Sequence, residues 1–433
     1  MTTDEAHATS EATISLWKNR SYRLLLTGAM AEDVGAAIGA FAVPLAAYAI
    51  TGSVVQAGVI SFVGQLGSVL MTLPAGVIVD RVDRRRLIMS GSTIAALAWL
   101  SVVVAGLADG LSITAPHLAG ALFVSSMVGS LMDPVGTAAL HAVVPRAHLG
   151  QAMSVAQGRD AASTLLQGPL GGLLYGMSTV LPFVVSAAGR LVSVVSTSLV
   201  REPLNGDLGA ARTEHPLASL REGLRYVFGV PLLRTAIWLF MLVNIVLNGM
   251  MVAINLHLVR IGTAPALIGL INTGVGVGVL AGSVLAGLLV NRVRVGALTA
   301  MALGVAGVAA VVMALYPTYW GFVPALTGMM FFAPALNAGM LSYATAITPG
   351  HMQGRMAATM GLTGLVAGPT APLAGSLLLA HLGIGAAMWL FAAGWAVLFL
   401  VVFLVRPLWR IGLPDTWAAD VLEWPTTPSS SAT

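Results

Sequence analysis

A small set of charged side chains interrupts the long apolar stretches in the first half of the sequence. These residues are Glu32, Asp33, Asp133, Arg159, Asp160 and Arg190. A charge at membrane depth costs about 2.5–3.5 kcal/mol even on the lenient insertion scale, so charges without a role should be rare there. A carboxylate in a low-dielectric cavity can bind and release a proton near neutral pH. These residues therefore carry the chemistry that the sequence offers.

The acidic pair at the start of this set lies well inside the first apolar stretch. Adjacent residues on a helix diverge by about 100°, so Glu32 and Asp33 cannot face one cavity equally. We predict Asp33 as the site of a proton or a cationic substrate, with Glu32 next. The alternative is a salt bridge to Arg190 or Arg159 that only holds helices together. Arg190 itself could bind an anionic group, tune Asp33 or stabilise packing.

The remaining charges lie closer to the ends of their apolar stretches. Long side chains near a helix end can reach the membrane surface. We therefore expect a structural role for Asp133, Arg159 and Asp160, grouped with a latch around Asp80.

Composition shows what must position these residues. Of the 433 residues, 57% are hydrophobic and 9% are charged, too apolar a chain for a water-soluble core. A spanning helix needs roughly 20 apolar residues, and stretches of that length recur from Leu24 almost to Val405. Only helices of this length satisfy their own backbone in lipid. The basic residues behind the net charge of +4 form short clusters between apolar runs, which excludes a nucleic-acid-binding face.

We predict an all-α membrane protein with twelve transmembrane helices in two pseudo-symmetric six-helix bundles. The predicted spans are residues 22–50, 54–79, 87–108, 115–140, 151–174, 180–200, 232–257, 265–290, 297–315, 320–345, 356–380 and 386–406. The predicted domains are an N-terminal tail (1–21), a first bundle (22–200), a linker (201–231), a second bundle (232–406) and a C-terminal tail (407–433). Leu217, Leu220, Leu224 and Val227 fall at helical spacing, so the linker should contain an amphipathic helix.

The positions of lysine and arginine predict the orientation. With the N-terminus inside, every loop cluster of Lys and Arg is cytoplasmic and only Arg260 lies outside. Both termini are therefore expected in the cytoplasm of a bacterial cell, with the chain in its inner (plasma) membrane.

The two halves resemble each other at several points. Gly76 to Val82 matches Gly287 to Val293, and Gly168-Pro169 matches Gly368-Pro369. Such duplication is typical of transporters. The sequence resembles the major facilitator superfamily, because Gly76, Asp80, Arg81, Arg84 and Arg85 are similar to that family's loop signature. The resemblance implies a gating latch at Asp80, Arg81, Arg84 and Arg85; the alternative is that these arginines only fix topology.

Two further patterns refine the resemblance. Gly168, Pro169, Gly171 and Gly172 are similar to a helix-kink signature of antiporter branches, with one residue fewer between the proline and the glycine pair. Simple tight helix packing is the alternative. Asn19-Arg20-x-Tyr22-Arg23 and Thr51-Gly52-Ser53 resemble the macrolide-efflux and siderophore-export branch, and residues 118–132 contain no basic side chain.

The second half supplies uncharged polar residues that could contact substrate. They are Asn244, Asn248, Asn272, Asn337 and Tyr343. Cysteine is absent, and no motif for a metal, a phosphate or a catalytic nucleophile occurs, so we predict no cofactor, no metal site and no enzyme.

Together these patterns predict a proton-coupled exporter of a hydrophobic or amphipathic small molecule, such as an antibiotic, acting by alternating access. The expected partners are that small-molecule substrate, protons and the lipid bilayer, with no nucleic acid, and the protein is expected to be a monomer. Uptake by proton symport is the nearest alternative. A membrane-embedded enzyme or accessory protein is a remote one.

Overall fold

Helices account for almost all of the chain in the computed structural model, which describes residues 16–108, 113–145, 148–205 and 216–420. No strand occurs within these ranges. In chain order the elements are η1 (Leu16–Lys18), α2 (Arg20–Thr51), α3 (Val54–Arg81), α4 (Arg84–Leu107), α5 (Ala115–Val143), α6 (Leu149–Met177), α7 (Leu181–Ser198), α8 (Pro216–Gly229), α9 (Pro231–Arg260), α10 (Pro265–Arg292), α11 (Val295–Leu315), α12 (Tyr319–Met330), α13 (Ala333–Ile347), η4 (Gly350–Met352), α14 (Gln353–Leu404), α15 (Arg406–Arg410) and η5 (Pro414–Asp420).

Ten helical spans of the described residues are long and apolar enough to cross a membrane. One of them, Tyr319–Ile347, comprises α12 and α13. Another, α14, is two helices joined at Gly383, where φ is 72°. With α6, whose length suffices but which carries Arg159 and Asp160, the number reaches twelve. The predicted fold class is thereby confirmed.

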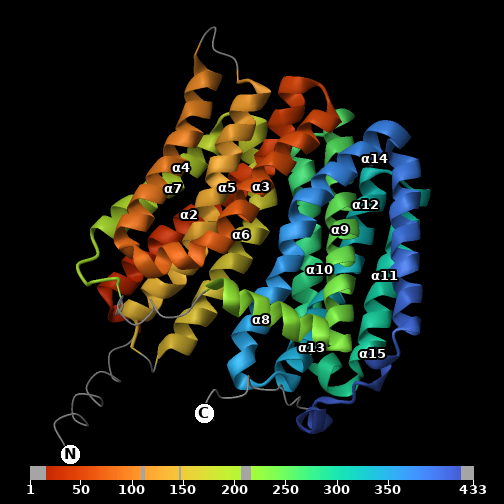
Figure 1. The fold of residues 1–433 in the computed structure, drawn as a ribbon. Coiled ribbons are helices and arrows are strands. Elements are labelled where there is room, and N and C mark those ends of the chain that lie inside the picture. The colour runs from red at the N-terminus through yellow and green to blue at the C-terminus, as the bar shows by residue number, and fades with distance from the viewer. Residues whose placement is uncertain (1–15, 109–112, 146–147, 206–215, 421–433) are drawn as a thin grey trace, which may run out of the picture. The chain divides into compact units, whose positions relative to one another are not determined.

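The chain divides into two compact units. Unit 1 comprises Met1–Thr213 with Asn255–Thr273, and unit 2 comprises Glu214–Ile254 with Gly274–Thr433. In unit 1, helices α2–α7 run side by side (Figure 1), with α2 against α6 and α7, and α5 against α3 and α4. Apolar side chains remain exposed on both units: Leu107 of unit 1 is 69% exposed and Val284 of unit 2 is 79% exposed. Surfaces of this kind suit contact with lipid.

The turns at the ends of α2 explain two of the sequence patterns. Asn19 caps α2 by accepting a hydrogen bond from the Tyr22 backbone N–H at 3.0 Å, and its side chain donates to the Val143 carbonyl at 3.0 Å. Gly52 ends α2 in the left-handed conformation, with φ of 65°, and Ser53 caps α3. Asn, Gly and Ser are the residues that favour these positions.

A close approach of α7 to α2 determines where the buried charges meet. Gly189 lies against the Ala31 carbonyl, and a Cβ at this position would overlap that oxygen. Small residues let two helix backbones approach at van der Waals distance. The neighbouring Arg190 is thereby brought next to Glu32 on α2.

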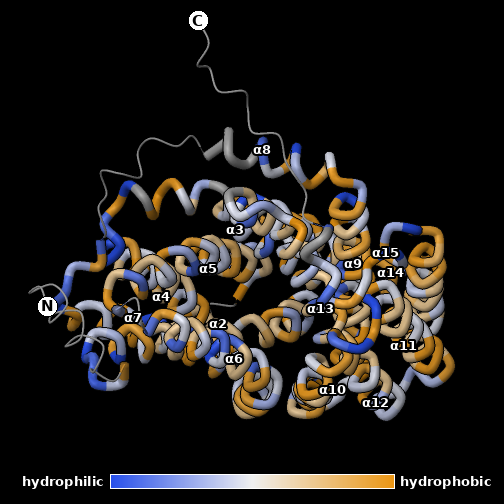
Figure 2. Tube along the Cα trace, turned by 90° about the horizontal axis from the view of Figure 1, so that it is seen from below, coloured by the Kyte–Doolittle hydropathy of each residue, from blue (hydrophilic) through white to orange (hydrophobic). Residues whose placement is uncertain are grey.

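In unit 2, α11 packs against α12, α13 and α14. The short helix α8 lies within the predicted linker and alternates between hydrophilic and hydrophobic residues (Figure 2). It packs on α14, where Glu222 forms an ion pair with Arg355 at 3.0 Å. The Tyr226 hydroxyl donates to Thr348 at 3.2 Å. These contacts attach the linker helix to the second bundle.

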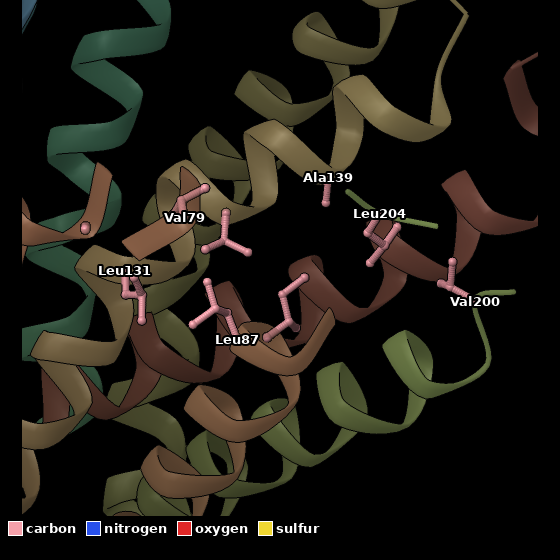
Figure 3. Close-up of a cluster of buried hydrophobic side chains, with 9 residues drawn as sticks. Val79, Leu87, Leu131, Ala139, Val200 and Leu204 are labelled. Carbon is pink, nitrogen blue, oxygen red and sulfur yellow. The ribbon is translucent and has the colours of Figure 1, made fainter. Parts of the chain in front are cut away.

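A buried apolar cluster holds the segment that follows α7. Val200 and Leu204 pack with Val79, Leu87 and Ala139 of α3, α4 and α5 (Figure 3). Val200 is 1% exposed and Leu204 is 2% exposed. Leu204, near the start of the predicted linker, therefore belongs to the core of unit 1.

Candidate functional site

Glu32 on α2 and Arg190 on α7 form a buried ion pair in unit 1. The Glu32 Oε1 and Arg190 Nη1 atoms are 2.6 Å apart. Ser92 of α4 donates to the other carboxylate oxygen at 3.0 Å. Only 2% of the Arg190 side chain is exposed. Both charges are thus paired and hydrogen-bonded, the condition under which buried charges are tolerated.

The ion pair extends into a wider polar network. Arg190 Nη2 donates to the Ser125 hydroxyl at 3.2 Å, and the Trp99 indole donates to the same oxygen at 2.9 Å. Trp99 stacks on Phe183 with ring centroids 5.1 Å apart. The network joins α2, α4, α5 and α7. Of the roles considered for Arg190, this placement fits packing.

Asp33 takes a different partner from its neighbour Glu32. Its Oδ2 atom lies 2.7 Å from Arg159 Nε on α6. Arg159 also donates from Nη2 to Asp160 Oδ1 at 2.9 Å. The Asp33 side chain is 34% exposed and that of Asp160 is 62% exposed. Within this triad, Asp33 and Arg159 are thus half-buried and Asp160 is exposed, whereas the Glu32–Arg190 pair is enclosed.

A cavity of about 340 Å³ within unit 1 contains this triad. Its walls come from α2, α4, α5, α6 and α7, and Asp133 on α5 faces it together with Tyr22 on α2. Lining residues range from Tyr22, Leu140 and Ala152, near the ends of their helices, to Asp33 deeper inside. The cavity thus extends inward from the end of the unit at which α2 begins.

Asp133, Arg159 and Asp160, which we expected to have a structural role around Asp80, line the unit 1 cavity. Asp133 lies ten residues before the end of α5 and Asp160 eleven residues after the start of α6, roughly 15 Å along each helix at 1.5 Å per residue. Both side chains face the cavity. Their part in a latch with Asp80 stays a prediction, because the Asp80 side chain lies outside the described part of the chain.

Two of the arginines predicted to form a latch, Arg84 and Arg85, bind the segment after α7 within unit 1. Arg84 Nη1 donates to the carbonyls of Ala138 at 3.2 Å and Leu204 at 3.0 Å. Arg85 donates to the Val200 carbonyl and, at 3.2 Å, to that of Glu202. Arg81 is exposed. The side chain of Asp80 lies outside the part of the chain that the structure describes.

Asp83 completes this arrangement as the cap of α4. Its carboxylate accepts from the Arg86 backbone N–H at 2.8 Å and from the Asn205 side chain at 2.6 Å. The bond from Arg86 first, and that from Asn205 after it, hold the pKa of Asp83 below its ordinary value. Hydrogen bonds to the charged form of a carboxylate have this effect.

The glycine and proline pattern of α6 lies at close helix contacts. Within unit 1, a Cβ at Gly168 would meet the Gly269 carbonyl of α10, and one at Gly172 would meet the Pro265 carbonyl. Gly171 faces the ring of Phe41 on α2. Pro169 lies inside the helix. The small residues therefore make room for two neighbouring helices.

The polar residues predicted as substrate contacts have separate environments. Asn244 and Asn248 each donate to a carbonyl of their own helix at 2.8 Å. Asn337 lines a pocket of about 200 Å³ in unit 2, with Phe240 and Met340.

Two of these residues lie elsewhere. Tyr343 donates to Asp420 at 3.1 Å and contacts the ring of Trp417 edge-on. Asn272 lies beside Gly168 in unit 1.

Sequence reasoning missed several residues of the site. Ser92, Trp99 and Ser125 complete the buried network, and Tyr22 lines the cavity. Serines within apolar helices are common, and no periodicity marked these. Tyr22 precedes Asp33 by eleven residues, roughly three helical turns, so the two lie on the same face of α2. That spacing is the one signal in the sequence that could have linked Tyr22 to the cavity.

Comparison with known sequences identifies a family and a relative. The sequence model described as Major Facilitator Superfamily matches residues 25–262, more than half of the chain. The multidrug efflux pump Tap of Mycolicibacterium fortuitum is 27% identical over 362 residues, covering 80% of this chain and 86% of Tap.

Comparison with solved structures shows the same fold. A bacterial homologue of the iron transporter ferroportin, in an inward-facing state, matches with a TM-score of 0.69 and 20% identity over 90% of this chain and 99% of the other. The nucleoside transporter NupG matches with a TM-score of 0.68 and 11% identity, over 91% of this chain and all of NupG. At these identities the likeness concerns architecture alone.

Proposed function

The chain belongs to the Major Facilitator Superfamily, and from this premise we propose that it exports a hydrophobic or amphipathic small molecule in exchange for protons. It acts in a bacterial plasma membrane with both termini in the cytoplasm. The half-buried Asp33–Arg159 ion pair at the wall of the cavity is the observation that supports this proposal.

Asp33 is suited to couple proton binding to a change in the cavity. When its carboxylate is charged, it attracts Arg159 at 2.7 Å. A proton on Asp33 removes that attraction, and Arg159 keeps its bond to Asp160 at 2.9 Å. Protonation therefore changes the charge of the cavity wall and frees the Asp33 carboxyl from its ion pair, while Arg159 remains paired with Asp160. A ligand with different affinity for two such states shifts the equilibrium between them.

The buried Glu32–Arg190 pair is suited to a structural role, in contrast to Asp33. Its side chains are 10% and 2% exposed, and hydrogen bonds from Ser92 and to Ser125 surround it. Such a network holds α2 against α4, α5 and α7 while Asp33 exchanges its proton. Glu32 thus has a structural role, in contrast to the neighbouring Asp33.

The proposed direction rests on two observations. The relative Tap is named as an efflux pump. The cavity extends from the end of unit 1 at which α2 begins, where Lys18, Arg20 and Arg23 gather. Positive segments of this kind are retained in the cytoplasm, so a substrate would enter the cavity from the cytoplasm.

Everted membrane vesicles test coupling and direction together. With an acidic interior, wild-type vesicles should accumulate ethidium or the uncharged dye Nile red, because the interior corresponds to the outside of the cell. Asp33→Asn should abolish this gradient-driven uptake and leave exchange between equal pH values intact. The matched control is Asp415→Asn, the same change at an exposed residue of η5.

The outcomes separate the alternatives. Loss of uptake in the Asp33→Asn vesicles, with retention in the Asp415→Asn vesicles, supports the proposal. Gradient-driven uptake that survives Asp33→Asn removes this residue from coupling. Accumulation only in right-side-out vesicles with an acidic exterior would instead establish proton symport into the cell.

A further inference from the structure

The carboxylates of the unit 1 cavity outnumber its arginines. Glu32 is paired with Arg190 at 2.6 Å and Asp33 with Arg159 at 2.7 Å. Asp133 and Asp160 also line the cavity, so it has two more carboxylates than the two arginines that pair with them. Unscreened like charges in a partly desolvated cleft concentrate ions of the opposite sign.

Asp133 is the carboxylate of this group without an ion-pair partner among the described residues. Asp160 shares Arg159 with Asp33. Asp133 is exposed and faces the cavity from α5, opposite the α2 and α6 residues of the triad. It is therefore free to supply a counter-charge without disturbing the Asp33–Arg159 pair.

Tyr22 provides an independent sign that this cavity holds a ligand. Its side chain lines the cavity and is 1% exposed. Within the described ranges its hydroxyl has no hydrogen-bond partner. Buried hydroxyls normally have a partner, so a group entering the cavity would satisfy this one.

We propose that the cavity selects organic cations and that Asp133 supplies their counter-charge, separately from Asp33. This inference rests on the proposed transport function and specifies its substrate class. The volume of about 340 Å³ suits a small drug-sized molecule. The apolar side chains of Leu25, Leu26 and Met132 in the wall would contact its hydrocarbon body.

The same walls argue against an inorganic ion. Among the described residues, no group of three or more histidine, aspartate or glutamate side chains is arranged to hold a metal ion. A hard divalent cation requires several oxygen ligands at once. A single carboxylate without an ion-pair partner, in a cavity that aliphatic side chains also line, fits a large, weakly hydrated cation better.

Equilibrium binding to the purified full chain in detergent tests this inference without a gradient. The probe is tetraphenylphosphonium, and triphenylphosphine oxide is an uncharged competitor of related shape. Asp133→Asn should weaken phosphonium binding about tenfold or more, as loss of a charged partner does in a desolvated site. Asp133→Glu, which keeps the charge, should retain most of the affinity. Asp415→Asn should match the wild type.

Each result bears on the inference. Unchanged phosphonium affinity in a monodisperse Asp133→Asn preparation would overturn it. Should that variant not fold, measurements on the wild type decide. The inference would also be overturned if triphenylphosphine oxide bound as tightly as the phosphonium, or if micromolar Mn²⁺ displaced the phosphonium. Binding needs no pH gradient, so failure of proton-driven transport in vesicles would leave a positive result standing. Conversely, transport of Nile red alone would uphold proton coupling while removing cation selection.

Discussion

At the scale of single residues, two adjacent carboxylates on α2 have different environments. The Glu32 side chain is 10% exposed and fully engaged with Arg190 and Ser92. The Asp33 side chain is 34% exposed and contacts Arg159 at the cavity. The 100° turn between neighbours on a helix directs one carboxylate into the bundle and the other toward the cavity. Enclosure suits the first to a structural role, and access suits the second to proton exchange.

Breaking the enclosed pair should destabilise the protein strongly. Arg190→Met leaves Glu32 as a buried carboxylate without its cation, which costs about 3–5 kcal/mol of unfolding free energy. The double variant Glu32→Gln with Arg190→Met should recover a large part of that loss, because no charge remains buried. Thermal unfolding of the purified variants measures both effects. A single variant as stable as the wild type would show that the pair does not hold the helices.

The sequence was sufficient to identify which residues of the site carry charge. Glu32, Asp33 and Arg190 stand out because charges within apolar stretches are costly. Ion pairs with Arg190 or Arg159 were one of the two alternatives, but which carboxylate meets which arginine could not be predicted. That depends on which face of α2 meets α7, and this follows from the contact of Gly189 with Ala31. That Asp133 and Asp160 line the same cavity could not be predicted for the same reason.

At the scale of elements, the contact of α6 with α10 depends on two glycines. A Cβ at Gly269 would overlap the Gly168 carbonyl, so any larger residue must push the helices apart. Overpacking of this kind is destabilising because the interior is already dense. The proline at 169 follows directly and limits how far α6 can adjust its backbone.

Gly269→Ala should therefore lower the unfolding free energy by about 1–3 kcal/mol and reduce gradient-driven transport. The matched control is Gly176→Ala on α6, where an added Cβ meets nothing within 4 Å. This control should be as stable and active as the wild type. Equal melting temperatures for both variants would show that the two helices separate without penalty.

The elements themselves follow closely from the apolar pattern. The predicted spans 54–79 and 115–140 correspond to α3 (Val54–Arg81) and α5 (Ala115–Val143). The interruption between α12 and α13 was not predicted, because the hydrophobic run from Tyr319 to Ile347 continues across it. The turn at Gly383 was expected between two spans, and there the chain adopts a positive φ within what otherwise continues as helix.

At the scale of the whole molecule, the membrane-spanning class follows from composition and is confirmed by the family and the fold. The two units carry different chemistry. Unit 1 contains a cavity with acidic walls, and unit 2 contains a smaller pocket lined mainly by apolar residues such as Phe240 and Met360. Under the proposed function, the cavity of unit 1 supplies both the acidic side chains and, through Leu25, Leu26 and Met132, the apolar contacts for an amphipathic cation.

The central claim is an exchange of protons for substrate, and proton movement tests it most directly. Proteoliposomes of the full chain, loaded with tetraphenylphosphonium and a pH-sensitive dye, are diluted into probe-free buffer with the membrane potential clamped to zero. The account predicts that phosphonium efflux acidifies the interior, and that Asp33→Asn abolishes the acidification. Phosphonium efflux through the wild-type protein without any pH change, or with alkalinisation of the interior, would contradict it.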